Sequence, residues 1–332
     1  MLNYTLIVTV IIIVFSLIFD FINGFHDTAN AIATSVSTKV LTLKEAIIMS
    51  ATLNLIGAFI SVKVAKTIGA DIVDPKLISQ MVIIAALVAA IIWNLITWYF
   101  GIPNSSSHAL IGGLLGASII YKSSFLIINW HSFITKVVLW LFLSPLIGFI
   151  IGYFIMILLY WILRSAKPRS VSKFFSKAQI ASAAFMAFNH GANDAQKSMG
   201  IITMTLLSGG FITYFHIPIW VKICCAFAMA LGTCTGGRRI IKTMGINMAR
   251  LAPVNGFAAE TGAAIVIFIA TMLRAPVSTT HIISTSIMGV GAAKRLSSVK
   301  WGVARSIVWA WILTIPVCMI LSGIIMFIFK LV

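Results

Sequence analysis

The chain has 332 residues, of which 60% are hydrophobic and 9% are charged, and its formal net charge is +17. Soluble domains carry about 25% charged residues, so this composition excludes a soluble globular protein and indicates a polytopic membrane protein. The positive charge does not indicate a nucleic-acid partner, because the 24 lysines and arginines lie mostly in short loops between apolar runs. That distribution is typical of membrane topology.

The apolar runs predict an all-α membrane protein, since a spanning helix needs about 20 mostly apolar residues. The runs cover Leu6 to Ile22, Ala46 to Val62, Met81 to Tyr99, Val137 to Ile162, Ile180 to Phe188, Ile219 to Ala230, Phe257 to Met272 and Val303 to Phe329. The first run has neither a preceding positive residue nor a following small-residue cleavage site, so we expect a retained span and not a signal peptide.

The first run leads into a polar stretch, NGFHDTAN, at residues 23–30. Asn, Gly and Asp are poor residues for helix interiors. We therefore predict unwound backbone near Asn23 to Asp27 and a short helix that begins at about Thr28. Backbone freed from helical bonding inside a bilayer is tolerated where protein or a water-filled cavity satisfies it, so this break is expected to line a site.

Further along, the sequence PNSSSH at residues 103–108 separates the run Met81 to Tyr99 from a helical segment, Ser105 to Ile120. The second arm is short for a full crossing. We predict a re-entrant helical hairpin whose tip carries hydroxyl groups. His108 follows the hydroxyls inside the first turn, where a packing role is the ordinary interpretation.

A basic junction, Arg164 to Lys177, contains no acidic residue and is predicted to be cytoplasmic by the positive-inside rule. Beyond it, the motifs of the first half recur in the same order. GANDAQKSMG from Gly191 aligns with GFHDTANAIA from Gly24, IIKTMG ending at Gly245 aligns with VAKTIG ending at Gly69, and PVSTTH at residues 276–281 aligns with PNSSSH. The chain is thus predicted to be a tandem duplication, with repeats at 1–163 and 178–332 joined by the linker 164–177.

Corresponding loops of the two repeats have opposite charge bias. The loop after the first polar motif contains Lys39 and Lys44, whereas its counterpart, SGGFITYFHIP, has no lysine or arginine. Equivalent loops are therefore expected on opposite sides of the membrane, with both chain termini outside. Inverted-topology repeats are a transporter architecture in which the binding site lies near the midplane at the repeat interface.

Two acidic residues, Asp27 and Asp194, lie in apolar surroundings at equivalent positions of the duplication. An intramembrane carboxylate is costly, and it usually marks an ion or substrate pathway. The alternative is an N-cap for the helix that follows. Asp20 and Glu260 also lie in apolar segments, but they do not pair across the repeat.

The second hairpin has its own short arm, Ser278 to Gly291, and its tip is expected to face the tip of the first from the opposite side. Helix starts offer unpaired N–H groups and the positive end of the dipole, to which hydroxyls add rotatable donors. Two facing tips would form a cage for a tetrahedral oxyanion. Ordinary N-capping by Ser and Thr is the alternative, and His281 has the same expected packing role as His108.

These motifs, together with GFAAETGAA from Gly256, resemble the inorganic phosphate transporter (PiT) family over nearly the whole chain. The resemblance implies a secondary phosphate transporter coupled to Na⁺ or H⁺, with an inverted repeat and a duplicated GANDxANA signature at its ion and phosphate sites. It also makes a homodimer reasonable. The second signature copy departs from the pattern at Gln196, Lys197 and Ser198. A fixed positive charge at Lys197 could replace one bound cation or contact phosphate.

The predicted mechanism joins these groups in one site. Phosphate is expected to bind the hydroxyls and amides of the tips, and a cation held by carboxylates and amides neutralises the repulsion between carboxylate and phosphate. The predicted substrate-binding residues are Asp27, Thr28, Asn30, Ser105, Ser106, Ser107, Asn193, Asp194, Gln196, Lys197, Ser278, Thr279 and Thr280, and the Na⁺ candidates are Asn23, Asp27, Asn30, Asn189, Asn193 and Asp194. A protonated Asp could replace Na⁺, because burial favours the neutral acid.

Other classes of function fit the sequence less well. A hydrolase needs one nucleophile with a base within reach, and duplication of every polar motif argues against it. An anion channel would use basic rings more naturally than paired acids, and a permease for sulfate or another oxyanion is the nearest alternative. We expect no cofactor beyond the coupling ion, no ATP-driven pumping and no nucleic-acid partner. The expected partners are phosphate, a monovalent cation and the lipid bilayer of the cytoplasmic membrane.

Overall fold

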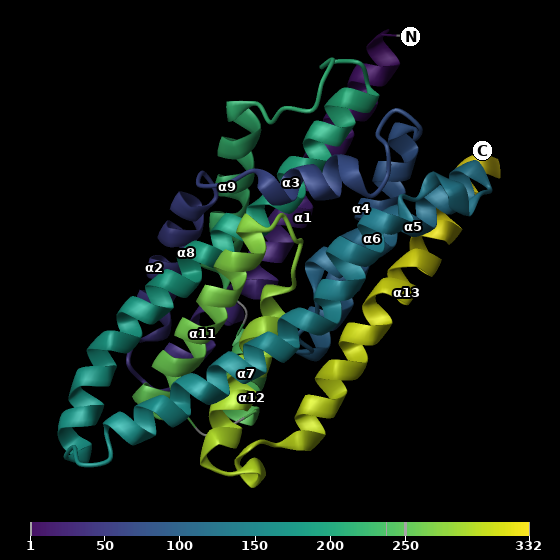
Figure 1. Cartoon of the computed structure of the whole chain (residues 1–332). Coiled ribbons are helices and arrows are strands. Elements are labelled where there is room, and N and C mark those ends of the chain that lie inside the picture. Colours follow the sequence, from purple (N-terminus) through teal and green to yellow (C-terminus); the bar gives the residue numbers. More distant parts are fainter. Residues whose placement is uncertain (1, 237, 249–250, 332) are drawn as a thin grey trace.

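In the computed structural model, which describes residues 2–236, 238–248 and 251–331, long helices form a bundle around two shorter, deeply buried helices (Figure 1). The helices are α1 (Leu2–Ser37), α2 (Leu43–Gly57), α3 (Lys63–Lys66), α4 (Gln80–Phe100), α5 (Ser106–Lys122), α6 (Trp130–Phe133), α7 (Leu139–Ile162), α8 (Pro168–Ser208), α9 (Ile219–Thr235), α10 (Arg238–Lys242), α11 (Pro253–Met272), α12 (Thr279–Lys294) and α13 (Trp301–Leu331). Within the described residues, five helical stretches are long and apolar enough to cross a membrane: 4–37, 80–100, 130–162, 253–272 and 301–331.

Both polar signature segments are helical, so the predicted unwinding at Asn23 to Asp27 is wrong. Helix α1 continues through residues 23–30 without a break, and α8 continues through the second copy at residues 189–197. The predicted span Ile180 to Phe188 is likewise only part of α8, which is 41 residues long.

Two physical reasons explain this continuity. The intrinsic cost of Asn or Asp in a helix interior is below about 1 kcal/mol per residue, and neighbouring helices supply hydrogen-bond partners for these side chains. The glycines serve close packing and not unwinding. A Cβ atom at Gly24 would lie 2.3 Å from the carbonyl oxygen of Met229, and one at Gly191 would lie 2.2 Å from that of Asn54. The backbones of α1 and α9, and of α8 and α2, therefore touch.

Two helical hairpins form where the PNSSSH and PVSTTH motifs predicted them. The first consists of α4 and α5, and the second of α11 and α12; Pro103 and Pro276 lie in the connections between the arms. The second arms contain 17 and 16 residues. At a rise of 1.5 Å per residue they are about 25 Å long, less than the roughly 30 Å of a bilayer core.

The second arm of each hairpin packs against the last long helix of the other half of the chain. Helix α5 lies against α13, and α12 lies against α7 (Figure 1). Both contacts are made through glycine. A Cβ atom at Gly116 of α5 would lie 2.0 Å from the carbonyl oxygen of Met319, and one at Gly289 of α12 would lie 2.1 Å from that of Phe149. The two halves are therefore interlocked.

Helices α1 and α8, which carry the two signature copies, run in opposite directions in Figure 1. Both chain termini lie at one end of the bundle, and the turn at residues 163–167 lies at the other end. Most of the predicted linker 164–177 is helical, because α8 begins at Pro168, a proline in the first helical turn where its missing N–H has no cost.

Candidate substrate and cation site

The two hairpin tips meet each other inside the bundle. The hydroxyl of Ser107, in the first turn of α5, donates to the carbonyl oxygen of Val277 at 3.1 Å. The rings of His108 and His281 lie 5.1 Å apart between their centroids, and His281 stacks on Trp311 at 4.0 Å. Both histidines are buried, which agrees with the packing role expected for them.

Ser106 connects the first tip to both signature helices. Its hydroxyl lies 2.6 Å from Oδ1 of Asn23 and 3.3 Å from Oδ2 of Asp27, and it accepts a hydrogen bond from the ammonium group of Lys197 at 2.9 Å. Because Asn23 and Asp27 lie on α1 and Lys197 lies on α8, one hydroxyl contacts groups of both signature helices. All four side chains are buried.

The carboxylate of Asp194 pairs with the lysine that departs from the signature. Oδ2 of Asp194 lies 2.9 Å from Nζ of Lys197 and 3.4 Å from Nε2 of His190, both on α8. The same oxygen is 3.5 Å from the amide nitrogen of Asn23 and from the hydroxyl of Thr279. The ammonium group of Lys197 is thus the nearest partner of Asp194.

The carboxylate of Asp27 has different partners. Its Oδ1 lies 2.8 Å from Nδ1 of His26 and 3.4 Å from the hydroxyl of Thr280. Nε2 of His26 reaches the hydroxyl of Thr97 at 3.3 Å. The partner of Asp27 is thus a histidine of its own helix, whereas the partner of Asp194 is a lysine.

The second tip is tied to the first signature copy through Asn30. The amide nitrogen of Asn30 donates to the hydroxyl of Thr279 at 3.2 Å and to that of Thr280 at 2.9 Å. Each tip therefore contacts α1, and the network between them contains both carboxylates, the ammonium of Lys197 and hydroxyls of both tips.

Three buried amide or carboxylate oxygens of the signature copies have no hydrogen-bond partner among the described residues: Oδ1 of Asn30, Oδ1 of Asn193 and Oδ1 of Asp194. In addition, one ligand atom from each of Asp27, His190 and Asp194 lies within 4.8 Å of the other two. Buried acceptors without donors are costly, and a hard cation prefers oxygen ligands of this kind. The arrangement therefore fits a cation as well as an oxyanion.

Some predicted site residues lie outside this network. Gln196 accepts from the backbone N–H groups of Val64 and Ala65 at 2.7 and 3.2 Å, and so holds α3 against α8. Thr28 and Asn189 donate to carbonyl oxygens of their own helices, at Gly24 and Phe185.

The remaining predicted residues lie at the edge of the network. The side chains of Ser105 and Ser278 accept the N–H groups of His108 and His281, each at 3.2 Å, and thereby cap α5 and α12. Asn193 donates to the hydroxyl of Thr271 at 2.8 Å. Helix capping is the alternative interpretation of the tip hydroxyls. It applies to the first hydroxyl of each hairpin motif, which is Ser105 or Ser278.

Sequence reasoning missed His26 and His190 as neighbours of the carboxylates. A signal existed for both. His26 adjoins Asp27 in the sequence. His190 lies four residues before Asp194, and this spacing places the side chains of His190 and Asp194 on one face of a continuous helix. The incorrect prediction of unwound backbone concealed the second relationship.

Two more carboxylates are buried on the signature helices or beside them. Neither oxygen of Asp20 has a hydrogen-bond partner among the described residues, although Lys197, Asp194 and the hydroxyl of Ser198 are close enough to interact with it. Glu260 on α11 accepts hydrogen bonds from Thr34, Ser182 and Gln179. Glu260 therefore has three neutral hydrogen-bond donors, whereas the neutral donor near Asp20 is the hydroxyl of Ser198.

The sequence also matches known proteins over most of its length. A profile described as "Phosphate transporter family" matches residues 23–170 and 164–322. The chain belongs to this phosphate transporter family. A relative in Bacillus subtilis (strain 168), named "Probable low-affinity inorganic phosphate transporter", is 48% identical over 297 residues, which cover 89% of each chain.

Other comparisons agree with membership of the phosphate transporter family. A relative of the same name in Rhizobium meliloti (strain 1021) is 46% identical and covers 86% of this chain and 85% of its own. Among solved structures, one described as "The sodium-dependent phosphate transporter" superimposes with a TM-score of 0.85 at 24% identity, covering 98% of this chain and 99% of its own. The fold is thus that of a membrane transporter, and the family consists of transporters and not of enzymes.

Proposed function

We propose that this protein is a secondary active transporter that imports inorganic phosphate across the cytoplasmic membrane together with Na⁺ or H⁺. The observation that carries the proposal is the network just described, in which two hydroxyl-bearing hairpin tips, two carboxylates and one ammonium group meet in the interior of the bundle. The names of the relatives at 48% and 46% identity support phosphate as the substrate.

Phosphate oxygens would be bound by the donors of the two tips and by Lys197. The ammonium group supplies a charge-assisted hydrogen bond, which is stronger than a neutral one. The first N–H groups of α5 and α12 have no partners within their own helices, and the hydroxyls of Ser106, Ser107, Thr279 and Thr280 stand beside them. Ser105 and Ser278 keep a hydroxyl hydrogen to donate while they accept as caps.

The carboxylates would couple phosphate to a cation. Asp27 and Asp194 contact the same tip hydroxyls as the anion would, so their negative charge opposes phosphate unless a positive charge is bound with it. The unpartnered oxygens of Asn30, Asn193 and Asp194 would serve as ligands for that charge. Binding of either ion therefore favours binding of the other.

Both coupling ions have support. The sodium dependence printed for the solved structure of the same fold favours Na⁺, and the group of Asp27, His190 and Asp194 is a suitable place for it. Proton coupling is favoured by Lys197, which already compensates Asp194 and leaves less need for a second cation, and by the buried, unpartnered Asp20.

The same carboxylates would select phosphate over sulfate. Dihydrogen phosphate can donate a hydrogen bond to Asp27 or Asp194, whereas sulfate carries no proton near neutral pH. A site with buried acceptors discriminates strongly against a ligand that leaves them unpaired.

Transport would proceed by alternating access between two inverted repeats, with the hairpins as re-entrant gates. Two observations support inverted repeats. Helices α1 and α8 run in opposite directions, and each proposed repeat donates an equivalent threonine hydrogen bond to the hairpin connection of the other. Thr67 donates to the carbonyl oxygen of Arg274 at 2.8 Å, and its counterpart Thr243 donates to that of Gly101 at 2.9 Å. The basic junction would be cytoplasmic, both termini outside, and the protein a homodimer, as the family resemblance implies.

Uptake of radiolabelled phosphate into proteoliposomes tests the proposal. The purified protein is given an inward Na⁺ gradient, an inward H⁺ gradient or neither, with excess unlabelled sulfate as the competitor. We expect one gradient to drive accumulation that sulfate does not block. Flux that stays downhill under every gradient would indicate a channel, and full displacement of phosphate by sulfate would indicate a permease for another oxyanion.

A further inference from the structure

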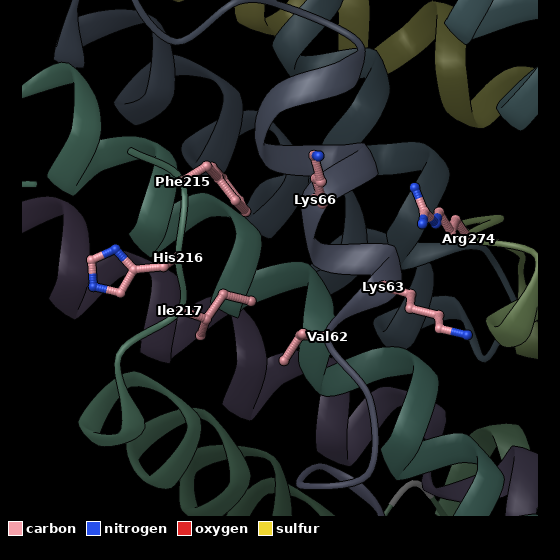
Figure 2. A pocket seen from close by; sticks show the side chains of 7 residues that line it. All are labelled: Val62, Lys63, Lys66, Phe215, His216, Ile217 and Arg274. Atoms are coloured by element: carbon pink, nitrogen blue, oxygen red, sulfur yellow. The ribbon is translucent and has the colours of Figure 1, made fainter. Parts of the chain in front are cut away.

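A pocket lined by basic residues lies beside the second hairpin, outside the network of carboxylates and hydroxyls. It has a volume of about 230 Å³ and is lined by Val62, Lys63, Lys66, Phe215, His216, Ile217 and Arg274. Figure 2 shows Lys63 and Lys66 on α3 and Arg274 on the loop after α11, on the same side of the pocket, with His216 on the other side. The side chains of all three basic residues are exposed.

These three positive charges have no acidic partner. The ion pairs of the described residues are His26 with Asp27, Lys136 with Asp71, and His190 and Lys197 with Asp194. Lys63 only approaches the sulfur of Met272, at 3.8 Å. A concave surface with charges of one sign raises the local concentration of ions of the opposite sign.

The backbone of Arg274 adds an independent observation. Its φ is +64°, in the left-handed region that favours glycine. The equivalent position of the first hairpin, 173 residues earlier in the chain, is Gly101, with φ +67°. Both carbonyl groups are held in the same way, by Thr67 and Thr243. The turn itself therefore suits glycine, and the second hairpin carries an arginine at the position where the first has glycine.

The pocket is adjacent to the substrate network. Arg274 lies four residues before Ser278, the cap of α12. Gln196, two residues after Asp194, holds the N–H groups of Val64 and Ala65, and a Cβ atom at Gly200 would lie 2.5 Å from the carbonyl oxygen of Ala65. Helix α3 and its lysines are thus fixed to α8 at residues that follow Asp194. This part of α8 leads toward Ser208, which lies on the outer side of the membrane in the predicted topology.

We propose that Lys63, Lys66 and Arg274 form an outer vestibule that binds phosphate weakly and passes it to the second hairpin tip. This inference rests on the proposed function and names a first binding step for the same substrate. The ligand class is a small, mobile oxyanion, because the basic groups are exposed and no buried donor in the pocket fixes its orientation. Gln196, expected at first to contact phosphate, acts here as a positioning residue for α3.

The test uses Arg274→Gly, which removes the charge and leaves the residue that the turn prefers. Lys39→Gly is the matched control: Lys39 is also an exposed basic residue, with φ +60°, and it lies at the end of α1 on the opposite side. Phosphate uptake is measured in right-side-out vesicles at fixed coupling-ion gradients, while choline chloride varies the ionic strength.

At low salt, where the Debye length is about 30 Å, we expect Arg274→Gly to raise the KM for influx about three- to tenfold and to leave the maximal rate unchanged. The rise in KM should disappear near 0.15 M salt. At low salt, Lys63→Gln and Lys66→Gln should each raise the KM for influx further. The KM for efflux and the behaviour of Lys39→Gly should match the wild type. An unchanged influx KM in Arg274→Gly, or an equal change in Lys39→Gly, would overturn the vestibule.

A second measurement does not depend on transport. His216→Cys in a Cys234→Ser background places a thiol in the pocket, and its reaction rates with anionic and cationic methanethiosulfonate reagents are compared. We expect the anionic reagent to be favoured, and this preference to fall when Arg274→Gly is added. Loss of phosphate transport in the wild type would contradict the proposed function alone, whereas equal rates for both reagents would contradict the vestibule.

Discussion

The two copies of the acidic signature resemble each other in sequence but differ in how their carboxylates are compensated. Asp194 pairs with the ammonium group of Lys197, whereas Asp27 pairs with the imidazole ring of His26. Asn30 occupies the position in the first copy that Lys197 occupies in the second, and it binds tip hydroxyls and not a carboxylate. The comparison teaches that two similar signature segments can place different partners beside their carboxylates, a lysine in one and a histidine in the other.

Neutralising Asp27 is expected to have the largest effect. Asp27 is one of the two carboxylates proposed to hold the coupling cation beside the tip hydroxyls, so a neutral amide in its place removes the charge that would link phosphate to the gradient. Asp27→Asn should therefore abolish gradient-driven phosphate uptake in proteoliposomes, and Asp194→Asn should do the same by leaving Lys197 unpaired. Uptake that persists in either variant would contradict a shared coupling role for the two carboxylates.

Making the copies alike should have the next largest effect. Lys197→Asn restores the residue found in the first copy, removes a charge-assisted contact worth about 1.5–3 kcal/mol and frees Asp194 to bind a cation. We expect the KM for phosphate to rise by at least about tenfold and the dependence of uptake on Na⁺ to become steeper. Lys197→Arg keeps the charge and is the control. An unchanged Na⁺ dependence in Lys197→Asn would show that the lysine does not replace a cation.

Asp20 is a second difference between the copies, because the equivalent residue of α8, 167 positions later, is Ala187. If Asp20 carries the proton, Asp20→Asn should lose accumulation driven by a pH gradient but keep exchange of labelled for unlabelled phosphate, which needs no net proton movement. Asp71→Asn, at a partly exposed carboxylate outside the network, is the control. Equal loss of exchange and accumulation would assign Asp20 a structural role.

The smallest effects are expected at the caps, where the two copies are alike. Ser105→Ala and Ser278→Ala each remove a helix cap worth about 1 kcal/mol of stability. Thermal unfolding in detergent should show similar small losses for both, and the KM for phosphate should change less than in Ser106→Ala, which loses contacts to Asn23, Asp27 and Lys197. A larger KM change in Ser105→Ala than in Ser106→Ala would make the cap a principal ligand.

Residue pattern alone predicted the helical hairpins, because a proline, a hydroxyl run and flanking apolar segments specify a chain break and a cap. It also identified most residues of the network, because charged and amide side chains are rare in apolar segments, but it missed His26 and His190. It was wrong about the backbone of the signatures. Propensity describes an isolated helix, whereas Gly24 and Gly191 are helical because α9 and α2 approach them within contact distance. Contacts between distant segments also placed Gln196 against α3, whereas His190 lies beside Asp194 because α8 is continuous.

The exchanged packing of the hairpin arms has a consequence for how the molecule can be divided. Helix α5 lies on α13 and α12 lies on α7, so each half of the sequence provides a surface that the other half covers. A cut in the turn at residues 163–167 leaves all of these contacts intact, and the two fragments should reassemble when they are produced together. Neither fragment alone can cover its buried glycine faces, so we expect that neither half of the sequence folds without the other.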